Sequence, residues 1–187
     1  DVAKTNKTVE LDGYNEHAER VQFLYKPDTT FSALFNVHQR TTNGSARLFR
    51  ANLIKKGTND IADGYDLDSI VTNAQNFQSL KTNGANARIT WDLGPVIFHS
   101  ITGYESVGSY YSRGDIDGGT PQGPGFIPFQ SETGGFIDDL KQYSQEFRVE
   151  SKNTGPLNWQ AGVYYFKEDV TGGSDGYNSA TGARTSR

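Results

Sequence analysis

Hydrophobic and polar side chains alternate along several stretches of the chain with a period of two residues. In residues 143–150, one side carries Tyr143, Phe147 and Val149, whereas the other side carries serine and charged residues. This period is that of a β-strand, whose successive side chains point to opposite faces. Residues 157–166 alternate in the same way after the turn 153–156, which contains Gly and Pro. Together they predict a β-hairpin with one apolar and one charged face.

Two further hairpins have the same layout. Residues 16–26 and 30–40 flank a turn at 27–29, and residues 88–93 and 96–111 flank Gly94 and Pro95. Alternation is blurred in 96–111, where Gly103 and Gly108 predict bulges or bends. The chain thus predicts about six antiparallel strands in three hairpins.

Long connections separate the hairpins, over residues 41–86 and 112–140, and a third long segment begins at residue 170. Connections of roughly 30 to 45 residues are unusual in globular domains, where about 4–6 is common. They are typical of outer-membrane barrels, which have short periplasmic turns and long outer loops. Strands of about 10 to 12 residues also suit a tilted membrane strand, which needs roughly 9 to 11. The predicted fold is therefore all-β, an antiparallel, up-and-down transmembrane β-barrel segment.

The first long connection allows two interpretations. Its residues 67–77 carry apolar side chains at helical spacing, with Asp66 as the N-cap, which predicts a short amphipathic helix. The alternative is an irregular loop whose last part extends into the next strand. Both interpretations stay open at this point.

Composition excludes several classes of function. The net charge is −4, and the basic and acidic residues are mixed along the chain, so nucleic-acid binding has no support. There is no cysteine, which removes disulfides and thiol nucleophiles. No run approaches the ~18 to 20 apolar residues of a membrane helix. The chain begins at Asp1 and has no methionine, so we expect a processed product or a piece of a longer polypeptide.

Candidate catalytic and metal-binding residues are sparse, and we expect neither an enzyme nor a cofactor. The three histidines fall in separate predicted strands without metal-ligand spacing. Aspartates cluster in residues 60–68 and at 115 and 117, where calcium binding and solvated carboxylates are alternatives, but no EF-hand pattern occurs. Glu146 and Glu150 lie roughly 13 Å apart along one strand, too far to share a proton.

Four segments resemble consecutive parts of one known barrel family: NARITWDLGPVIFHSITGYESV, SRGDIDGG, GPGFIPFQSET and QYSQEFRVESKNTGPLNWQAGVYYFKED. They are similar to the barrels of TonB-dependent outer-membrane receptors, in particular the iron-siderophore-receptor-like class of Gram-negative bacteria. The similarity covers most of residues 19–169. Its best markers are the WDLG turn, the SITGY strand and the GPLNW hairpin.

This resemblance implies a larger receptor in the cell outer membrane of a Gram-negative bacterium. The family has a 22-strand barrel and a plug domain, and the TonB complex acts through the plug. Its partners would be outer-membrane lipid, that complex and a scarce large solute such as a ferric siderophore. The chain contains no plug, TonB box or final strand of such barrels, so residues 1–187 are expected to form a partial barrel domain.

The alternation also predicts which side chains face the lumen and which face lipid. The charged set predicted to face the lumen comprises Arg88, Asp92, Glu146, Arg148 and Glu150. The apolar set predicted to face lipid comprises Ile89, Trp91, Phe147, Val149, Trp159 and Val163. The loop aromatics offered as solute contacts are Tyr65, Phe77, Phe126, Phe129 and Phe136. Packing of the loops against one another is the alternative role for these five.

Two other functions stay open from the sequence. A passive, porin-like barrel would have the same strand pattern without a plug. A soluble, secreted β-sandwich that binds carbohydrate would fold alone in water without detergent.

Overall fold

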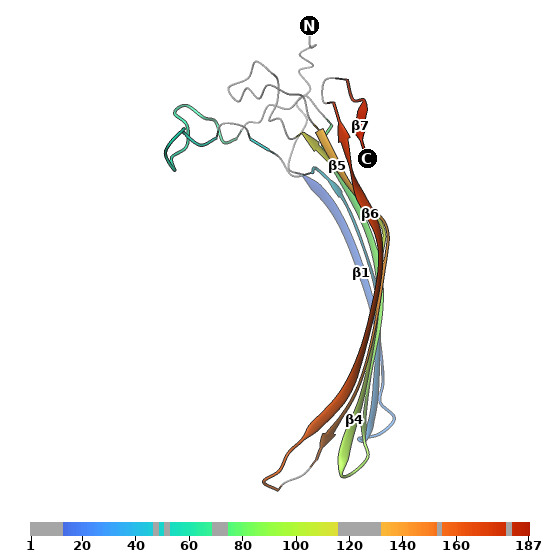
Figure 1. Ribbon diagram of the computed structural model, residues 1–187. Helices are drawn as coiled ribbons and strands as arrows, with labels where there is room; N and C mark the ends of the chain where they lie inside the picture. Colours follow the sequence, from blue (N-terminus) through green and yellow to red (C-terminus); the bar gives the residue numbers. More distant parts are fainter. Residues whose placement is uncertain are drawn as a thin grey trace.

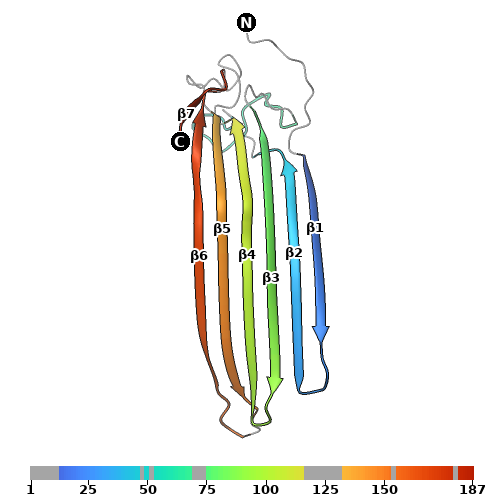
Figure 2. The ribbon, with the colours of Figure 1, turned by 90° about the vertical axis from the view of Figure 1, so that its right-hand side faces the viewer.

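A computed structural model of the chain describes residues 13–46, 49–50, 53–68, 75–115, 132–152, 155–178 and 181–187. These residues form one antiparallel sheet of seven strands, which lie side by side in chain order (Figures 1 and 2). The strands are β1 (Tyr14–Tyr25), β2 (Phe31–Gly44), β3 (Phe77–Asp92), β4 (Val96–Asp115), β5 (Glu132–Ser151), β6 (Gln160–Tyr177) and β7 (Arg184–Ser186). The predicted all-β, antiparallel, up-and-down architecture is thus confirmed, with the short β7 added to the six expected strands.

The connections differ in length at the two ends of the sheet. Residues 26–30, 93–95 and 152–159 join β1 to β2, β3 to β4, and β5 to β6, and all three turns lie at one end (Figure 2). In the second turn, Gly94 has a φ of 93°, and the Leu93 amide donates to the Val96 carbonyl at 2.9 Å. Glycine reaches positive φ without strain, so the chain reverses tightly here. The longer connections lie at the opposite end.

The sheet is a single curved layer with a convex and a concave face (Figure 1). The register places residues of neighbouring strands in rows across the sheet; Val21, Val37 and Ala85 form one such row. Among the described residues, the only buried hydrophobic side chains are Ala33 and Ala46. The described part of the chain therefore has no hydrophobic core of its own, and its apolar side chains lie on the surface.

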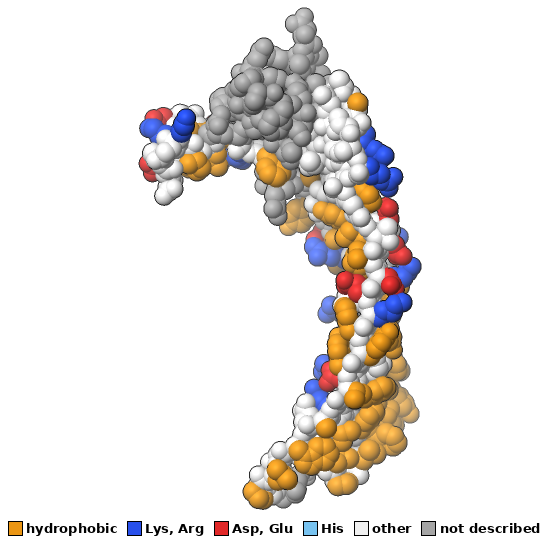
Figure 3. Space-filling model, in the orientation of Figure 1, with side chains coloured by type: hydrophobic (Ala, Val, Ile, Leu, Met, Phe, Trp, Pro, Cys, Tyr) orange, Lys and Arg blue, Asp and Glu red, His pale blue; other side chains and the backbone are white. Residues whose placement is uncertain are grey.

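Apolar side chains on the convex face form a band beside the short turns (Figure 3). We call these residues the apolar band: Val21, Phe23, Tyr25, Phe31, Phe35, Val37, Ile89, Trp91, Phe98, Phe147, Val149, Val163 and Tyr165. In β2 the band runs from Phe31 to Val37. Seven residues at roughly 3.3 Å per residue make it about 23 Å long, measured along the strand.

The strands continue well beyond the apolar band, which corrects the predicted loop boundaries. β3 begins at Phe77 rather than at residue 87, β5 begins at Glu132 rather than at 141, and β6 runs to Tyr177. Alternation reveals a strand only where one face is apolar. Beyond the band neither face is consistently apolar, so these paired segments have the composition of loops.

The helix interpretation for residues 67–77 is only partly testable. Residues 69–74 lie outside the described part of the chain, and Phe77 is the first residue of β3. The end of this segment therefore extends into the next strand, as the alternative interpretation had it.

Bulges interrupt β4 and β5 at the same level. Thr82 pairs with Val107 and Lys81 with Ser109, which leaves Gly108 unpaired. In β5 the register shifts between Ile137 and Asp139. The predicted bulge at Gly108 is confirmed, whereas Gly103 pairs regularly with both neighbouring strands.

Candidate functional site

The concave face of the sheet carries a set of charged side chains, most of which lie beside an ionisable partner. It includes all five residues predicted from alternation to face a lumen, because their register places them on the face opposite the apolar band. Arg148 Nη1 lies 3.4 Å from Glu146 Oε1, and Lys152 forms an ion pair with Asp92. Glu150 pairs instead with His99, whose Nε2 lies 3.3 Å from Glu150 Oε1. The structure therefore brings the predicted residues onto one surface and adds histidine to it.

A second histidine pair crosses an entire strand. His38 of β2 and Glu105 of β4 are both aligned with Gly84 of β3. His38 Nε2 lies 3.1 Å from Glu105 Oε2, and the amide nitrogen of Asn36 lies 3.1 Å from His38 Nδ1. A Cβ on Gly84 would lie 2.2 Å from Glu105 Oε2 and 2.4 Å from His38 Nε2. Only glycine at this position leaves room for the pair.

Five of the six residues predicted to face lipid share the opposite, convex face. Ile89, Trp91, Phe147, Val149 and Val163 belong to the apolar band, and Phe98 stacks on Phe147 with ring centroids 6.1 Å apart. Val163 is 68% exposed and Trp91 is 47% exposed, although both are large and apolar. Contiguous exposed apolar surface of this kind marks a binding or membrane surface.

Trp159, the sixth predicted residue, precedes β6 rather than lying in a strand. Its carbonyl accepts from the Ser151 amide at 2.9 Å, and its amide donates to the Ser151 hydroxyl at 2.9 Å. The side chain is 46% exposed at the turn end of the sheet.

The loop aromatics do not converge on one site. Phe77 and Phe136 lie in strands, where Phe77 stacks on Tyr111 and Phe136 lies beneath the Arg187 guanidinium. Tyr65 lies in the described connection between β2 and β3. Phe126 and Phe129 fall outside the described residues. A shared role for the five as solute contacts stays a prediction.

A buried polar cluster, absent from the sequence predictions, lies at the long-connection end of β4, β5 and β6. Arg113 forms an ion pair with Glu132, whose side chain is 1% exposed, and its guanidinium lies 3.6 Å from the centroid of the Tyr177 ring. The Tyr111 and Tyr177 hydroxyls lie 2.8 Å apart across Gly134. No spacing in the sequence could reveal this cluster, because only the register of three strands brings its members together.

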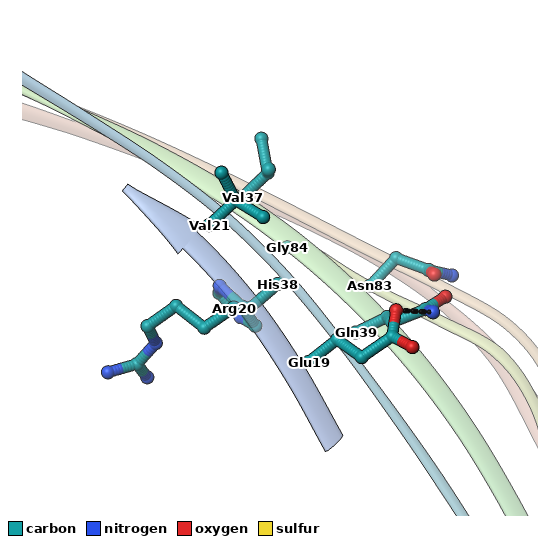
Figure 4. Close-up of a pocket in the computed structure, with 8 residues that line it drawn as sticks. All are labelled: Glu19, Arg20, Val21, Val37, His38, Gln39, Asn83 and Gly84. Atoms are coloured by element: carbon teal, nitrogen blue, oxygen red, sulfur yellow. Dashed lines mark hydrogen bonds between the residues drawn. The ribbon is translucent and has the colours of Figure 1, made fainter. Parts of the chain in front are cut away.

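A shallow hollow of 320 Å³ lies on β1, β2 and β3 where the apolar band ends (Figure 4). Val21 and Val37 lie on one side of it, and the Gln39 side-chain amide donates to the Glu19 carboxylate at 2.5 Å. Arg20 points away from both valines, toward the concave face. The hollow marks the level at which the convex face changes from apolar to polar.

The described residues contain no group of histidine, cysteine and acidic side chains that could hold a metal ion. Aspartates of the 60–68 region make local contacts instead: Asp63 pairs with Lys55 at 2.8 Å, and Asp66 Oδ1 accepts from the Asp68 amide at 2.9 Å. No helix in the described part of the chain is long and apolar enough to cross a membrane.

Comparisons of the chain with protein-family models, with curated proteins and with solved structures found no match.

Proposed function

We propose that the chain is a segment of the wall of a TonB-dependent outer-membrane transporter. The observation that carries the proposal is the two-faced sheet: a tall apolar band on the convex face and paired charges on the concave face. A barrel wall needs this division, because one face meets hydrocarbon and the other meets a water-filled lumen.

Topology and strand length support the same function. Neighbouring strands are consecutive in the chain, every described turn between long strands lies at one end, and the long connections lie at the other. Strands β3 to β6 have 16 to 20 residues, more than the roughly 9 to 11 that cross a bilayer. Their excess length lies on the side of the long connections.

The substrate and the energy source come from the family resemblance. By that resemblance, outer loops capture a scarce large solute, such as a ferric siderophore, and the solute passes through the lumen after the TonB complex acts on a plug. The concave-face charges are then lumen-facing, and the apolar band contacts lipid of the outer membrane.

Two neighbouring residues of β5 test the assignment of the faces. Val149→Arg places a cation in the apolar band at a cost of about 2–4 kcal/mol, whereas Arg148→Gln removes a charge from the concave face. The measurement is the fraction of heat-modifiable, folded protein in the outer membrane of the cell that makes it. We expect Val149→Arg to block assembly and Arg148→Gln to preserve it. Equal tolerance of the two substitutions would contradict the proposal.

Energised transport is tested separately from assembly. Uptake of a ferric siderophore by cells that make the protein should stop when the proton gradient of the inner membrane is collapsed. A passive, porin-like barrel would continue to admit solute under the same conditions.

A further inference from the structure

Most acidic side chains on the concave face of the strands lie beside a basic or histidine side chain of the same sheet. Glu16 pairs with Arg40 at 2.6 Å, and the pairs His38–Glu105, His99–Glu150 and Arg148–Glu146 lie within 3.4 Å. These contacts join residues of the same strand, of adjacent strands and of strands two apart. A carboxylate beside a basic or histidine side chain is therefore the common arrangement on this face.

Three strand residues of the concave face form no ion pair in the described part of the chain. They are Arg20 on β1, Arg88 on β3 and Glu168 on β6. Arg88 lies on an internal strand and faces Leu34 and Ile101 on its two neighbours. Arg20 and Glu168 lie instead on the two outermost long strands, where a neighbour is missing on one side.

One row of the sheet contains both of these outer charges. The register aligns, in order, Arg20, His38, Gly84, Glu105, Gln142 and Glu168. The interior of the row is occupied by the histidine–glutamate pair above Gly84. Only the two ends of the row carry a charge without a partner.

The free edge of β1 is long and unprotected. Among the described residues, β1 pairs only with β2, and all twelve residues of β1 are exposed. An open edge of this length is a template for another strand. Side chains directly opposite on adjacent antiparallel strands lie about 4.5–5.5 Å apart at Cβ, close enough for opposite charges to pair.

We propose that the free edge of β1 takes an antiparallel strand that places a carboxylate beside Arg20, in the same row of the concave face. This proposal rests on the proposed function: the occupant is a further strand of the same barrel wall, supplied by the same polypeptide. Apolar side chains of that strand lie opposite Val21, Phe23 and Tyr25 on the convex face. Arg20 thus contacts the next strand through charge; within the sheet, Arg40 of β2 contacts Glu16 of β1 in the same way, although diagonally, from one row to the next on that face.

A zero-length cross-link tests this assignment in the full polypeptide in its own membrane. Arg20→Lys keeps the charge and supplies a primary amine, which a carbodiimide couples to a carboxylate only when the two groups touch. Mass spectrometry should find position 20 joined to an Asp or Glu outside residues 1–187. Arg40→Lys is the positive control, because Glu16 lies beside it. Gln22→Lys, on the same strand and face but in the next row, should give a yield several-fold lower.

Each other outcome overturns the assignment. Coupling of position 20 to Glu168 would show that a second copy of this chain occupies the edge. A yield no higher than that of Gln22→Lys would show that no carboxylate lies in the row. Failure of the proposed function is seen independently, as protein that lacks a heat-modifiable form in the outer membrane.

Discussion

At Gly84, side chains from both neighbouring strands, β2 and β4, meet above β3. The His38–Glu105 pair lies directly above the Cα of Gly84, and the Asn36 side-chain nitrogen contacts the other ring nitrogen of His38. The Oδ1 atom of Asn36 is buried without a hydrogen-bond partner.

Gly84→Ala should therefore lower the free energy of unfolding by about 1–3 kcal/mol, the usual cost of overpacking. The measurement is the unfolding midpoint in detergent, followed by tryptophan fluorescence. Gly108→Ala is the matched control, since nothing lies within 4 Å of its Cβ position. In a Glu105→Ala background the cost of Gly84→Ala should shrink. An undiminished cost there would show that backbone, rather than the pair, resists the methyl group.

Asp28 makes the first hairpin turn sensitive to pH. Its Oδ1 accepts from the Thr30 hydroxyl at 2.8 Å and from the Thr30 and Phe31 amides at 2.7 and 2.9 Å. The hydroxyl of Thr30 first, and then the two amides, lower the pKa of this carboxyl below its ordinary value. The carboxylate therefore stabilises the turn above the unfolded-state pKa of about 3.9, and this contribution is lost as the pH falls through the lowered folded-state pKa.

Asp28→Asn should remove that pH dependence. The difference in unfolding midpoint between the native protein and the variant should be present at neutral pH and vanish in acid. The measurement is a series of unfolding curves between about pH 2 and pH 7, a range that spans the ordinary pKa of aspartate. A difference that stays constant over this range would show that the negative charge plays no part in the turn.

At the scale of the strands, sequence reasoning succeeded wherever one face was apolar. Val21, Phe23 and Tyr25 alternate with polar neighbours, and the hairpins they predict are present. It failed where β5 passes through Glu132 to Leu140, because the apolar side chains there do not alternate with polar ones: Phe136 and Ile137 are consecutive. The Arg113–Glu132 pair was missed for a further reason: it depends on bulges that change which residues share a face.

The bulge at Gly108 sets the facing of the end of β4. Deleting Gly108 should shift the alignment of the residues that follow it, turning Tyr111 and Arg113 to the other face. Glu132, which is 1% exposed, would then lose its partner, and breaking a buried pair costs about 3–5 kcal/mol. We expect the unfolding midpoint to fall accordingly, whereas Gly108→Ala, which keeps the bulge, should leave it nearly unchanged. Equal midpoints for the deletion and the substitution would contradict this role.

At the scale of the molecule, the described part of the chain is one layer with two long open edges and an apolar face. Within the described residues, nothing covers the two edges along most of their length or the apolar face, and the buried hydrophobic side chains are two alanines. The 187-residue chain alone in water should therefore self-associate through its edges and its apolar band. Sedimentation without detergent should show large species, and detergent should reduce their size. A compact monomer in water would favour the soluble carbohydrate-binding alternative.

The order of the strands also determines how the sheet would respond to a pulling force. In the described part of the chain, each long strand is hydrogen-bonded only to the strands that come directly before or after it in the sequence. Tension applied along the chain therefore acts on one outer strand at a time and breaks the hydrogen bonds of that strand one after another. The sheet has no strand that must be sheared past two partners at once. Such a wall would be extracted in steps of one strand or one hairpin, each leaving behind a shorter sheet of the same design.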